Sequence, residues 1–232
     1  EKYCSEEDSD FGHHIIPPMI ENDKVYLYSF DDYWRDVGTL EAFWRTNLEL
    51  TDPIPELNLY DEEWKLFTRS EEKPPVKFGE NGGTQKSLIS NGAIINGRVE
   101  NSVISPGVYI EEGALVKDSI IFNDTVIRKN AEIEKAIIDK EVEIQANCKI
   151  GVGDDMTPNQ EKPDLLNNGL NIIAKRATVP EDTTIERNCR IFSYAAPADF
   201  DSNIIESGST VSSEIGYKLA KGDEDQVREL NV

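Results

Sequence analysis

The stretch "VENSVISPGVYIEEGALVKDSIIFNDTVIRKNAEIEKAIIDKEVEIQANCKI", residues 99 to 150, repeats Val and Ile at steps of five or six residues. When every seventeenth residue is taken, three series appear, and ten of their eleven members are Val or Ile. The series are Ala93, Ile110, Ile127 and Ile144; Val99, Val116, Ile133 and Ile150; and Ile104, Ile121 and Ile138. An α-helix repeats its apolar face about every 3.6 residues, so this spacing excludes a helix.

A second set of residues, mostly small or β-branched, follows each of these anchors by four positions and is predicted to point inward as well. Its members are Val103, Val108, Ala114, Ile120, Thr125, Ala131, Ile137, Val142 and Cys148. Gly, Asn or Asp stands between the anchors, as in Asn96-Gly97 and Asn123-Asp124, and these residues suit tight corners. A meander of hairpins needs longer strands. The pattern therefore predicts stacked coils, each built of three short strands.

The repeat is interrupted at residues 151–169, where a polar, Pro- and Asn-rich run predicts a loop that leaves one corner. It then resumes, with anchors at Ile173, Val179, Ile185 and Ile191 and small inward residues at Ala177, Thr183 and Cys189. This hexapeptide spacing resembles that of the left-handed parallel β-helix family, and the handedness is an expectation from the resemblance alone. Cys148 and Cys189 are interpreted as packed small apolar residues.

The composition narrows the function classes. The chain has 45 acidic and 24 basic residues, with a formal net charge of −21. This balance disfavours binding to nucleic acid or to an anionic membrane, both of which need clustered basic residues. No stretch is apolar enough for a membrane span. The three cysteines have neither metal-ligand nor disulfide spacing, which suits a reducing compartment, so a cytoplasmic location is expected.

The first 52 residues have a different pattern. "KVYLYSF", residues 24–30, alternates in the way of a strand, and Thr39 can cap a helix that carries Leu40, Phe43, Trp44 and Leu48. The helix is expected to end before Thr51. In such a strand–loop–helix unit, ligands bind at the carboxyl end of the strand. Asp36 lies there and could face a metal-bound phosphate; it could instead pair with Arg35.

Several motifs in order carry a wider resemblance: "SDFGHHIIP" (9–17), "YWRDVGTLEAFW" (33–44), "LNLYDEEW" (57–64) and "SLISNGAIINGRVENSVISPGVYI" (87–110). Together they resemble the C-terminal half of the glucose-1-phosphate adenylyltransferase family, over residues 9 to 192. The resemblance implies that residues 1–52 are the C-terminal remnant of an α/β nucleotidyltransferase domain and that residues 53–86 are a linker. Residues 87–192 would form the left-handed β-helix, and residues 193–232 a C-terminal extension.

The same resemblance implies a reaction and its residues. ATP and glucose 1-phosphate would give ADP-glucose and pyrophosphate, with Mg²⁺ on the phosphates. Asp36 matches a family metal ligand, Trp34 an aromatic beside the glucosyl pocket, and Asp10 with Phe11 a pair that lines the sugar site. Without the resemblance, Asp10 would be interpreted as a cap and Trp34 as a core residue. Family members are commonly homotetramers controlled by metabolites, in the cytoplasm or, in plants, the plastid.

Other family features do not match. The sequence has no Gly-x-Gly-Thr-Arg run to cradle a triphosphate, and Lys73 in "SEEKP" comes after the Asp36 motif, whereas the family's sugar-phosphate Lys comes before the Asp-Phe-Gly segment. This chain alone is therefore expected to be an inactive fragment that lacks the nucleotide-binding half. The alternatives are a non-catalytic scaffold or regulatory subunit, and an enzyme of different nucleotide specificity. An acyltransferase is disfavoured because the two histidines, His13 and His14, both precede the coils.

Overall fold

A computed structural model describes residues 3–5, 10–68 and 71–220 of the protein. It contains two compact units, residues 1–34 and 35–232. The first holds a single π-helical turn, η1 (Phe11–Ile15), followed by helix α1 (Ile16–Asn22). The second holds helix α2 (Leu40–Glu49), a stack of short strands, the 3₁₀ turn η2 (Pro197–Asp199) and helix α3 (Glu214–Ala220).

The strands form three parallel sheets, which contain six, seven and seven strands among the described residues. The first sheet contains β1 (Lys77–Phe78), β4 (Ile94–Ile95), β7 (Tyr109–Ile110), β10 (Val126–Ile127), β13 (Glu143–Ile144) and β16 (Thr178–Val179). The second contains β2 (Gly83–Gln85), β5 (Arg98–Glu100), β8 (Leu115–Lys117), β11 (Glu132–Glu134), β14 (Lys149–Ile150), β17 (Thr184–Ile185) and β19 (Ile204–Ile205). The third contains β3 (Leu88–Ile89), β6 (Val103–Ile104), β9 (Ile120–Ile121), β12 (Ala136–Ile138), β15 (Asn171–Ile173), β18 (Arg190–Ile191) and β20 (Thr210–Val211).

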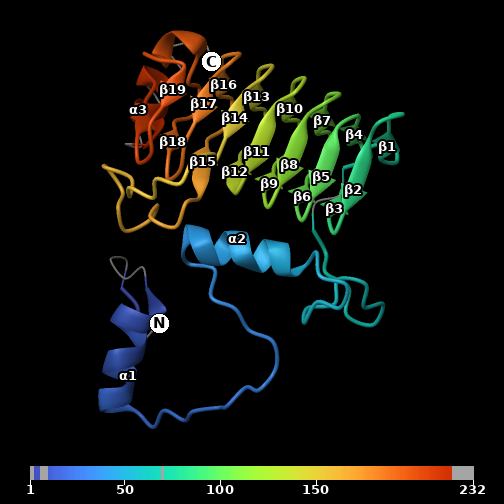
Figure 1. The fold of residues 1–232 in the computed structure, drawn as a ribbon. Coiled ribbons are helices and arrows are strands. Elements are labelled where there is room, and N and C mark those ends of the chain that lie inside the picture. The colour runs from blue at the N-terminus through green and yellow to red at the C-terminus, as the bar shows by residue number, and fades with distance from the viewer. Residues whose placement is uncertain (1–2, 6–9, 69–70, 221–232) are drawn as a thin grey trace. The chain divides into compact units, whose positions relative to one another are not determined.

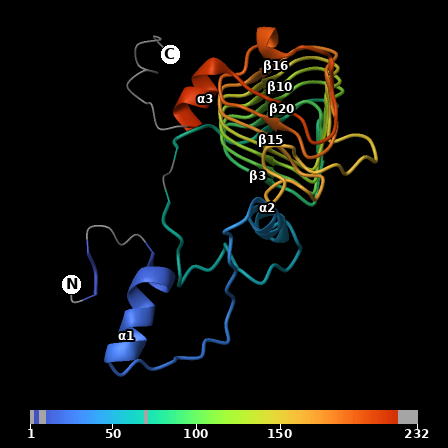
Figure 2. The same cartoon turned by 90° about the vertical axis from the view of Figure 1, so that its left-hand side faces the viewer.

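Six coils take one strand from each sheet, and the last described coil has only β19 and β20. This is the left-handed parallel β-helix that the family resemblance implies (Figure 1). Seen along the stack, the coils superimpose as a closed outline (Figure 2). Two of the three predicted series are confirmed by the strand register: Val99 pairs with Val116, and Ile104 pairs with Ile121. These anchors are fully buried in one continuous core.

The first series is wrong at its first member. Ile95, not Ala93, pairs with Ile110. The corner that joins β4 to β5 is two residues shorter than the corner that joins β7 to β8. Gly97 makes this corner possible, since a Cβ at Gly97 would lie 2.4 Å from the carbonyl oxygen of Ala114. Ala93 is buried instead at a small position, where its carbonyl oxygen accepts from the N–H of Lys77.

The predicted small inward residues divide into two groups. Six of them lie in the core as predicted: Val108, Ala114, Thr125, Ala131, Val142 and Cys148. For Val103, Ile120 and Ile137 the prediction was wrong. Each directly precedes an inward anchor, and successive side chains of a strand point to opposite faces, so these three point outward. They belong to a separate apolar cluster that α2 covers.

The corners have the backbone that the Gly, Asn and Asp pattern predicts. Gly107, Gly113, Asp124 and Asn130 have φ between 56° and 77°, in the left-handed region. Residues less suited to this region adopt it at equivalent places, and they include Lys86, Lys135, Glu141 and Arg176. The coil stack therefore imposes the corner geometry even where the side chain disfavours it.

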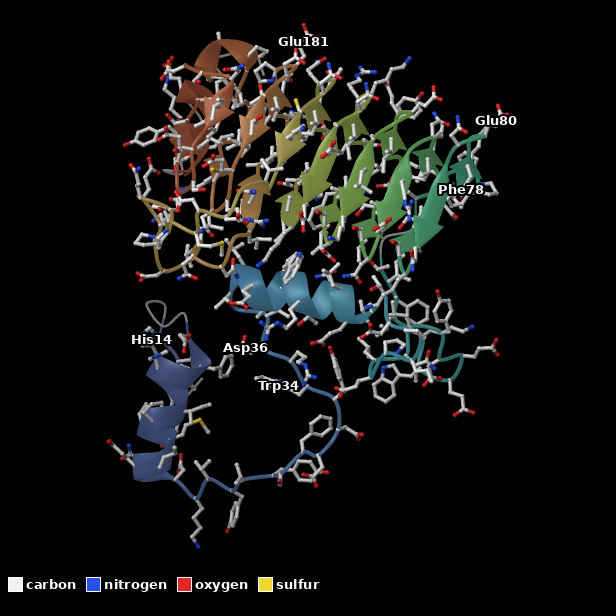
Figure 3. All side chains as sticks on the ribbon, in the orientation of Figure 1. His14, Trp34, Asp36, Phe78, Glu80 and Glu181 are labelled. Atoms are coloured by element: carbon white, nitrogen blue, oxygen red, sulfur yellow. The ribbon has the colours of Figure 1, made fainter. Side chains whose placement is uncertain are left out.

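The strand ladder extends past the expected bounds of 87 and 192 at both ends. Strands β1 and β2 lie in the segment expected to be a linker, and β19 and β20 lie in the expected extension. In Figure 3, Phe78 and Glu80 mark the first coil. The rest of the extension that is described ends at Ala220 with α3, and residues 221–232 lie outside the described residues.

Residues 151–169 form the excursion between β14 and β15, which stands out from the side of the stack (Figure 2). Its anchor is Asn159, whose side chain is completely buried. The Asn159 amide nitrogen lies 3.1–3.2 Å from the carbonyl oxygens of Asn188, Gly208 and Ser209. One side chain therefore ties this polar loop to a corner of the coils.

In the first 52 residues, one predicted element is confirmed and one is wrong. Helix α2 begins after Thr39, whose hydroxyl oxygen accepts from the N–H of Ala42 at 3.1 Å. The predicted strand at residues 24–30 is wrong: these residues form no strand, and Tyr26, Leu27 and Tyr28 are more than four-fifths exposed. A strand needs a neighbouring strand for its backbone hydrogen bonds, and none of the described strands pairs with this segment.

Candidate functional site

Asp36 lies on the exposed segment that leads into α2 (Figure 3). Its Oδ1 accepts a hydrogen bond from the N–H of Gly38 at 2.8 Å. An aspartate that bonds the backbone two residues ahead forms a turn of its own, which restricts the direction of the carboxylate. A Cβ on Gly38 would lie 3.0 Å from the same oxygen, so a small residue at this position allows the turn.

The alternative that Asp36 pairs with Arg35 is not what the described ion pairs show. The Nε of Arg35 lies 3.4 Å from Glu49 Oε2, and its Nη2 lies 3.0 Å from Glu56 Oε2. Both glutamates belong to α2 or to the segment after it. Arg35 therefore ties the start of this unit to the far end of α2, and the Asp36 carboxylate is oriented by its own turn.

Helix α2 holds this segment against the coils. The Nε1 of Trp44 donates to the backbone carbonyl oxygen of Asp118 at 2.8 Å, and the ring of Phe43 stacks on that of Phe122 at 6.4 Å. Leu40 contacts the same apolar cluster. The ammonium group of Lys135 lies 5.4 Å from the centre of the Trp44 ring. Burial lowers the pKa of Lys135, with Arg187 contributing next.

Asp10, Phe11 and Trp34 belong to the other unit, residues 1–34. Asp10 caps η1, since its Oδ1 accepts from the N–H of His13 at 2.7 Å and lies 3.0 Å from His13 Nδ1. The His13 backbone bond, followed by its side chain, lowers the pKa of Asp10. Asp10 is therefore an ionised acceptor at neutral pH, as a carboxylate that receives a sugar hydroxyl must be. Phe11 is 77% exposed and Trp34 69% exposed.

The described residues hold no group of three or more His, Cys, Asp or Glu side chains that could bind a metal ion alone. Mg²⁺ commonly takes only one or two protein carboxylates and completes its shell with water and substrate phosphates. Asp36, exposed and restricted in direction, fits one such ligand. The other ligands would have to come from outside the described groups.

The coils themselves carry little reactive chemistry. Cys148 and Cys189 are completely buried at small core positions, as the sequence predicts. Burial raises the pKa of each thiol to about 11. Lys73, which sequence reasoning set aside as a phosphate ligand, pairs with Asp124 at 2.6 Å and with Glu71 at 3.2 Å. Lys73 thus attaches the segment before β1 to a corner of the coils.

Sequence reasoning missed the contacts between α2 and the coils. Trp44 was assigned only to the apolar face of the helix, and the outward position of Ile120 and Ile137 was not recognised. One signal was present: the pairs Val103-Ile104, Ile120-Ile121 and Ile137-Ile138 place two apolar residues together, although a strand with a solvent-exposed outer face would alternate.

Two family models match parts of this chain. Residues 2–53 match the family described as nucleotidyl transferase, and residues 74–173 match the family described as GlmU-like, C-terminal hexapeptide. No helix among the described residues has the length and apolar character to cross a membrane.

Curated relatives match along most of this chain. The glucose-1-phosphate adenylyltransferase of Acetivibrio thermocellus is 41% identical over 203 residues, which cover 87% of this chain and 47% of that protein. The protein of the same name from Thermomicrobium roseum is 44% identical over 204 residues, with 88% and 48% covered. The chain thus spans about half the length of the curated relatives it matches. It is a homologue of glucose-1-phosphate adenylyltransferases that corresponds to their C-terminal portion, with the end of the nucleotidyltransferase domain.

Proposed function

We propose that this chain is the C-terminal part of a glucose-1-phosphate adenylyltransferase, which converts ATP and glucose 1-phosphate to ADP-glucose and pyrophosphate in glycogen or starch synthesis. The observation that carries the proposal is the order of the two matches, with the end of a nucleotidyl transferase at residues 2–53 followed by a hexapeptide coil at residues 74–173. The three free cysteines suit a reducing compartment such as the cytoplasm.

In the proposed reaction, an oxygen of the sugar phosphate attacks the α-phosphorus of ATP. A new P–O bond forms, the bond to the bridging oxygen breaks, and pyrophosphate leaves with the electron pair. Mg²⁺, when bound, neutralises the phosphates. Asp36 would be one of its ligands, because its turn directs an exposed carboxylate. Asp10 would accept a glucosyl hydroxyl, and the exposed rings of Phe11 and Trp34 would line the sugar.

The assembly is also part of the proposal. We infer a homo-oligomer, a tetramer by the resemblance. The end coils of the stack support this in general terms, because β1 and β20 are edge strands whose outer backbone groups can pair or be covered. Size-exclusion chromatography with light scattering on the complete gene product tests the oligomeric state directly.

The activity is tested by pyrophosphate release with Mg²⁺ and glucose 1-phosphate, with ATP, UTP, dTTP or GTP as the nucleotide. The assay is run on this chain, on the complete gene product and on that product with Asp36→Asn. We expect release with ATP from the complete product only, and a loss of at least about 100-fold in the variant. Release with another nucleotide would change the assigned specificity. No release from the complete product would favour a scaffold or regulatory subunit.

A further inference from the structure

One corner of the coil stack differs from the others in what covers it. Four successive coils place a residue with positive φ there, at φ values between 42° and 52°. These residues are Lys86, Asn101, Asp118 and Lys135. Helix α2 and the turn after it contact all four, so this corner is a continuous docking row for one segment of the chain (Figure 1).

The contacts occur in a consistent order. At the first coil, Asp52 Oδ1 lies 2.7 Å from the Nζ of Lys86. At the second, the hydroxyl of Thr51 lies 3.0 Å from Asn101 Oδ1, and the same hydroxyl donates to the carbonyl oxygen of Leu48. The segment therefore runs antiparallel to the coil order, with its C-terminal end on the first coils.

The third and fourth coils hold the helix itself. Trp44 donates to the carbonyl oxygen of Asp118, and the ammonium group of Lys135 lies over the Trp44 ring, 5.4 Å from its centre. Asp118 in turn accepts from the side chain of Asn101 at 2.6 Å, so neighbouring docking residues are connected. The segment from Trp44 in the helix to Asp52 in the turn after it thus reaches four successive coils.

The Asp36 turn is attached directly to this docked segment. Gly38, whose N–H holds Asp36 Oδ1, precedes Thr39, the cap of α2. Arg35 adds a second attachment through Glu49 at the last turn of the helix. A displacement of α2 along the corner would therefore carry the carboxylate of Asp36 with it.

We propose that α2 is a strut through which the coil stack sets the position of the Asp36 carboxylate, and that Trp44, Thr51 and Asp52 are positioning residues for it. This inference rests on the proposed role of Asp36 as a metal ligand. Phosphate-transfer sites depend on placement, and a shift of about 1 Å can lower the rate about 100-fold. The position of α2 would thus control how a divalent cation and the phosphates bound to it meet the Asp36 carboxylate.

A simpler alternative is that α2 only covers the apolar residues Ile120 and Ile137. The two readings differ in what the polar contacts do. Trp44→Phe keeps an aromatic ring over the cluster and removes the bond to Asp118, and Asp52→Asn removes the charge opposite Lys86. If α2 only covers the apolar residues, both changes should leave residues 36–42 as they are. If α2 sets the position of Asp36, both changes should free the helix to shift along the coils.

Two measurements test the strut. The first is hydrogen exchange of the amides of residues 36–42 in this chain without metal. The second is the Mg²⁺ concentration for half-maximal pyrophosphate release by the complete gene product. We expect Trp44→Phe combined with Asp52→Asn to speed exchange in residues 36–42 and to raise the Mg²⁺ requirement about tenfold. Arg45→Gln is the matched control, because Arg45 pairs with Glu41 on the same helix and is 63% exposed.

The outcomes separate the two proposals. Unchanged exchange and an unchanged Mg²⁺ requirement in the double variant would overturn the strut, whatever the change in its urea midpoint. If the wild-type complete product releases no pyrophosphate, the proposed function fails, and the exchange measurement still decides whether the corner contacts order residues 36–42. Asp52→Lys alone should speed the exchange of residues 36–42, and adding Lys86→Asp should make it slow again, because the ion pair is then re-formed with its charges exchanged. A general loss of folding would not be repaired by a second substitution.

Discussion

The indole nitrogen of Trp44 and the backbone carbonyl oxygen of Asp118 are 2.8 Å apart, although 74 residues separate them in the sequence. This bond joins the segment that carries Asp36 to the third coil of the stack. A buried or half-buried indole N–H normally has such a partner, and a corner carbonyl turned outward supplies it here. The bond fixes the place of the helix along this corner, beside the apolar cluster that contains Ile120 and Ile137.

Replacement of Trp44 should therefore destabilise the docking of α2 in two steps. Trp44→Phe removes one hydrogen bond and should cost about 1 kcal/mol. Trp44→Ala also removes the ring from the cluster and should cost about 2–4 kcal/mol. Urea unfolding followed by tryptophan fluorescence and circular dichroism measures both, with Trp64, which is 78% exposed, changed to Phe as the control. Equal midpoints for Trp44→Phe and Trp44→Ala would contradict the ring contribution.

The thiols should differ in reactivity. Burial raises the pKa of Cys148 and of Cys189 to about 11, and both are fully enclosed, whereas Cys4 is exposed. At pH 8 a disulfide reagent such as dithionitrobenzoate should titrate one thiol per native chain and three in denaturant, because only an exposed thiol can form an accessible thiolate. Cys4→Ser should abolish the native reaction. Rapid reaction of two or three native thiols would show that the core opens.

Gly107 should not tolerate a side chain. Its φ is +76°, and a Cβ would lie 2.1 Å from Asp124 Oδ1 and 2.4 Å from the Nζ of Lys73. Gly107→Ala combines backbone strain with a clash at an ion pair, so we expect a loss of about 2–4 kcal/mol. Gly83, where a Cβ would meet nothing within 4 Å, is the matched control. Gly83→Ala should be neutral or stabilise by about 0.5–1 kcal/mol, as judged from urea midpoints.

The 151–169 loop should depend on Asn159. Its amide nitrogen lies within 3.2 Å of three backbone carbonyl oxygens, and its Oδ1 accepts from the N–H groups of Glu161 and Lys162. Asn159→Ala leaves these groups without their partner and should cost at least about 2 kcal/mol. Limited proteolysis should then cut within the loop faster than in the wild type. Asn167→Ala, in the same loop but exposed, should be cut at the wild-type rate.

The cap of η1 should be sensitive to acid. The pKa of Asp10 is lowered in the folded protein from its usual value of 3.8, first by the His13 backbone N–H. Its stabilising effect is therefore complete above the unfolded pKa and is lost as the pH falls through the lower, folded pKa. Amide exchange at His13, followed by NMR, should rise only below about pH 4. In Asp10→Asn this pH dependence should disappear, and an unchanged rise in this variant would contradict the role of the Asp10 carboxylate.

Much of the coil could be predicted because its rules are local. The steps between Val99, Ile104 and Ile110 are those of short strands joined by corners, and the same steps recur in the next two coils, from Val116 and from Ile133. The predictions that were wrong concern residues whose structure depends on a neighbouring residue or strand. Val103 has the composition of an inward residue, but the adjacent Ile104 already takes the inward direction. Residues 24–30 have the pattern of a strand, but none of the described strands pairs with them.

The sequence predicted which residues belong to the candidate site, but not their contacts with distant residues. The turn at Asp36 and the helix capped by Thr39 follow from side chains two or three positions away, and the helix cap was predicted. The roles of Asp36, Asp10, Phe11 and Trp34 in substrate and metal binding remain predictions from the resemblance. The described contacts add that Arg35 pairs with glutamates of α2 and beyond, which sequence spacing did not indicate.

The sequence by itself determined the coil, because each strand is two or three residues long and an alternation of side-chain direction can be read within that length. The tertiary structure alone decided the shortened β4–β5 corner at Gly97, the partners of Lys73 and the place of α2 on the row from Lys86 to Lys135. Those features depend on atoms that belong to other coils, in several cases 50 or more residues away. A local pattern contains no information about which distant surface will meet it.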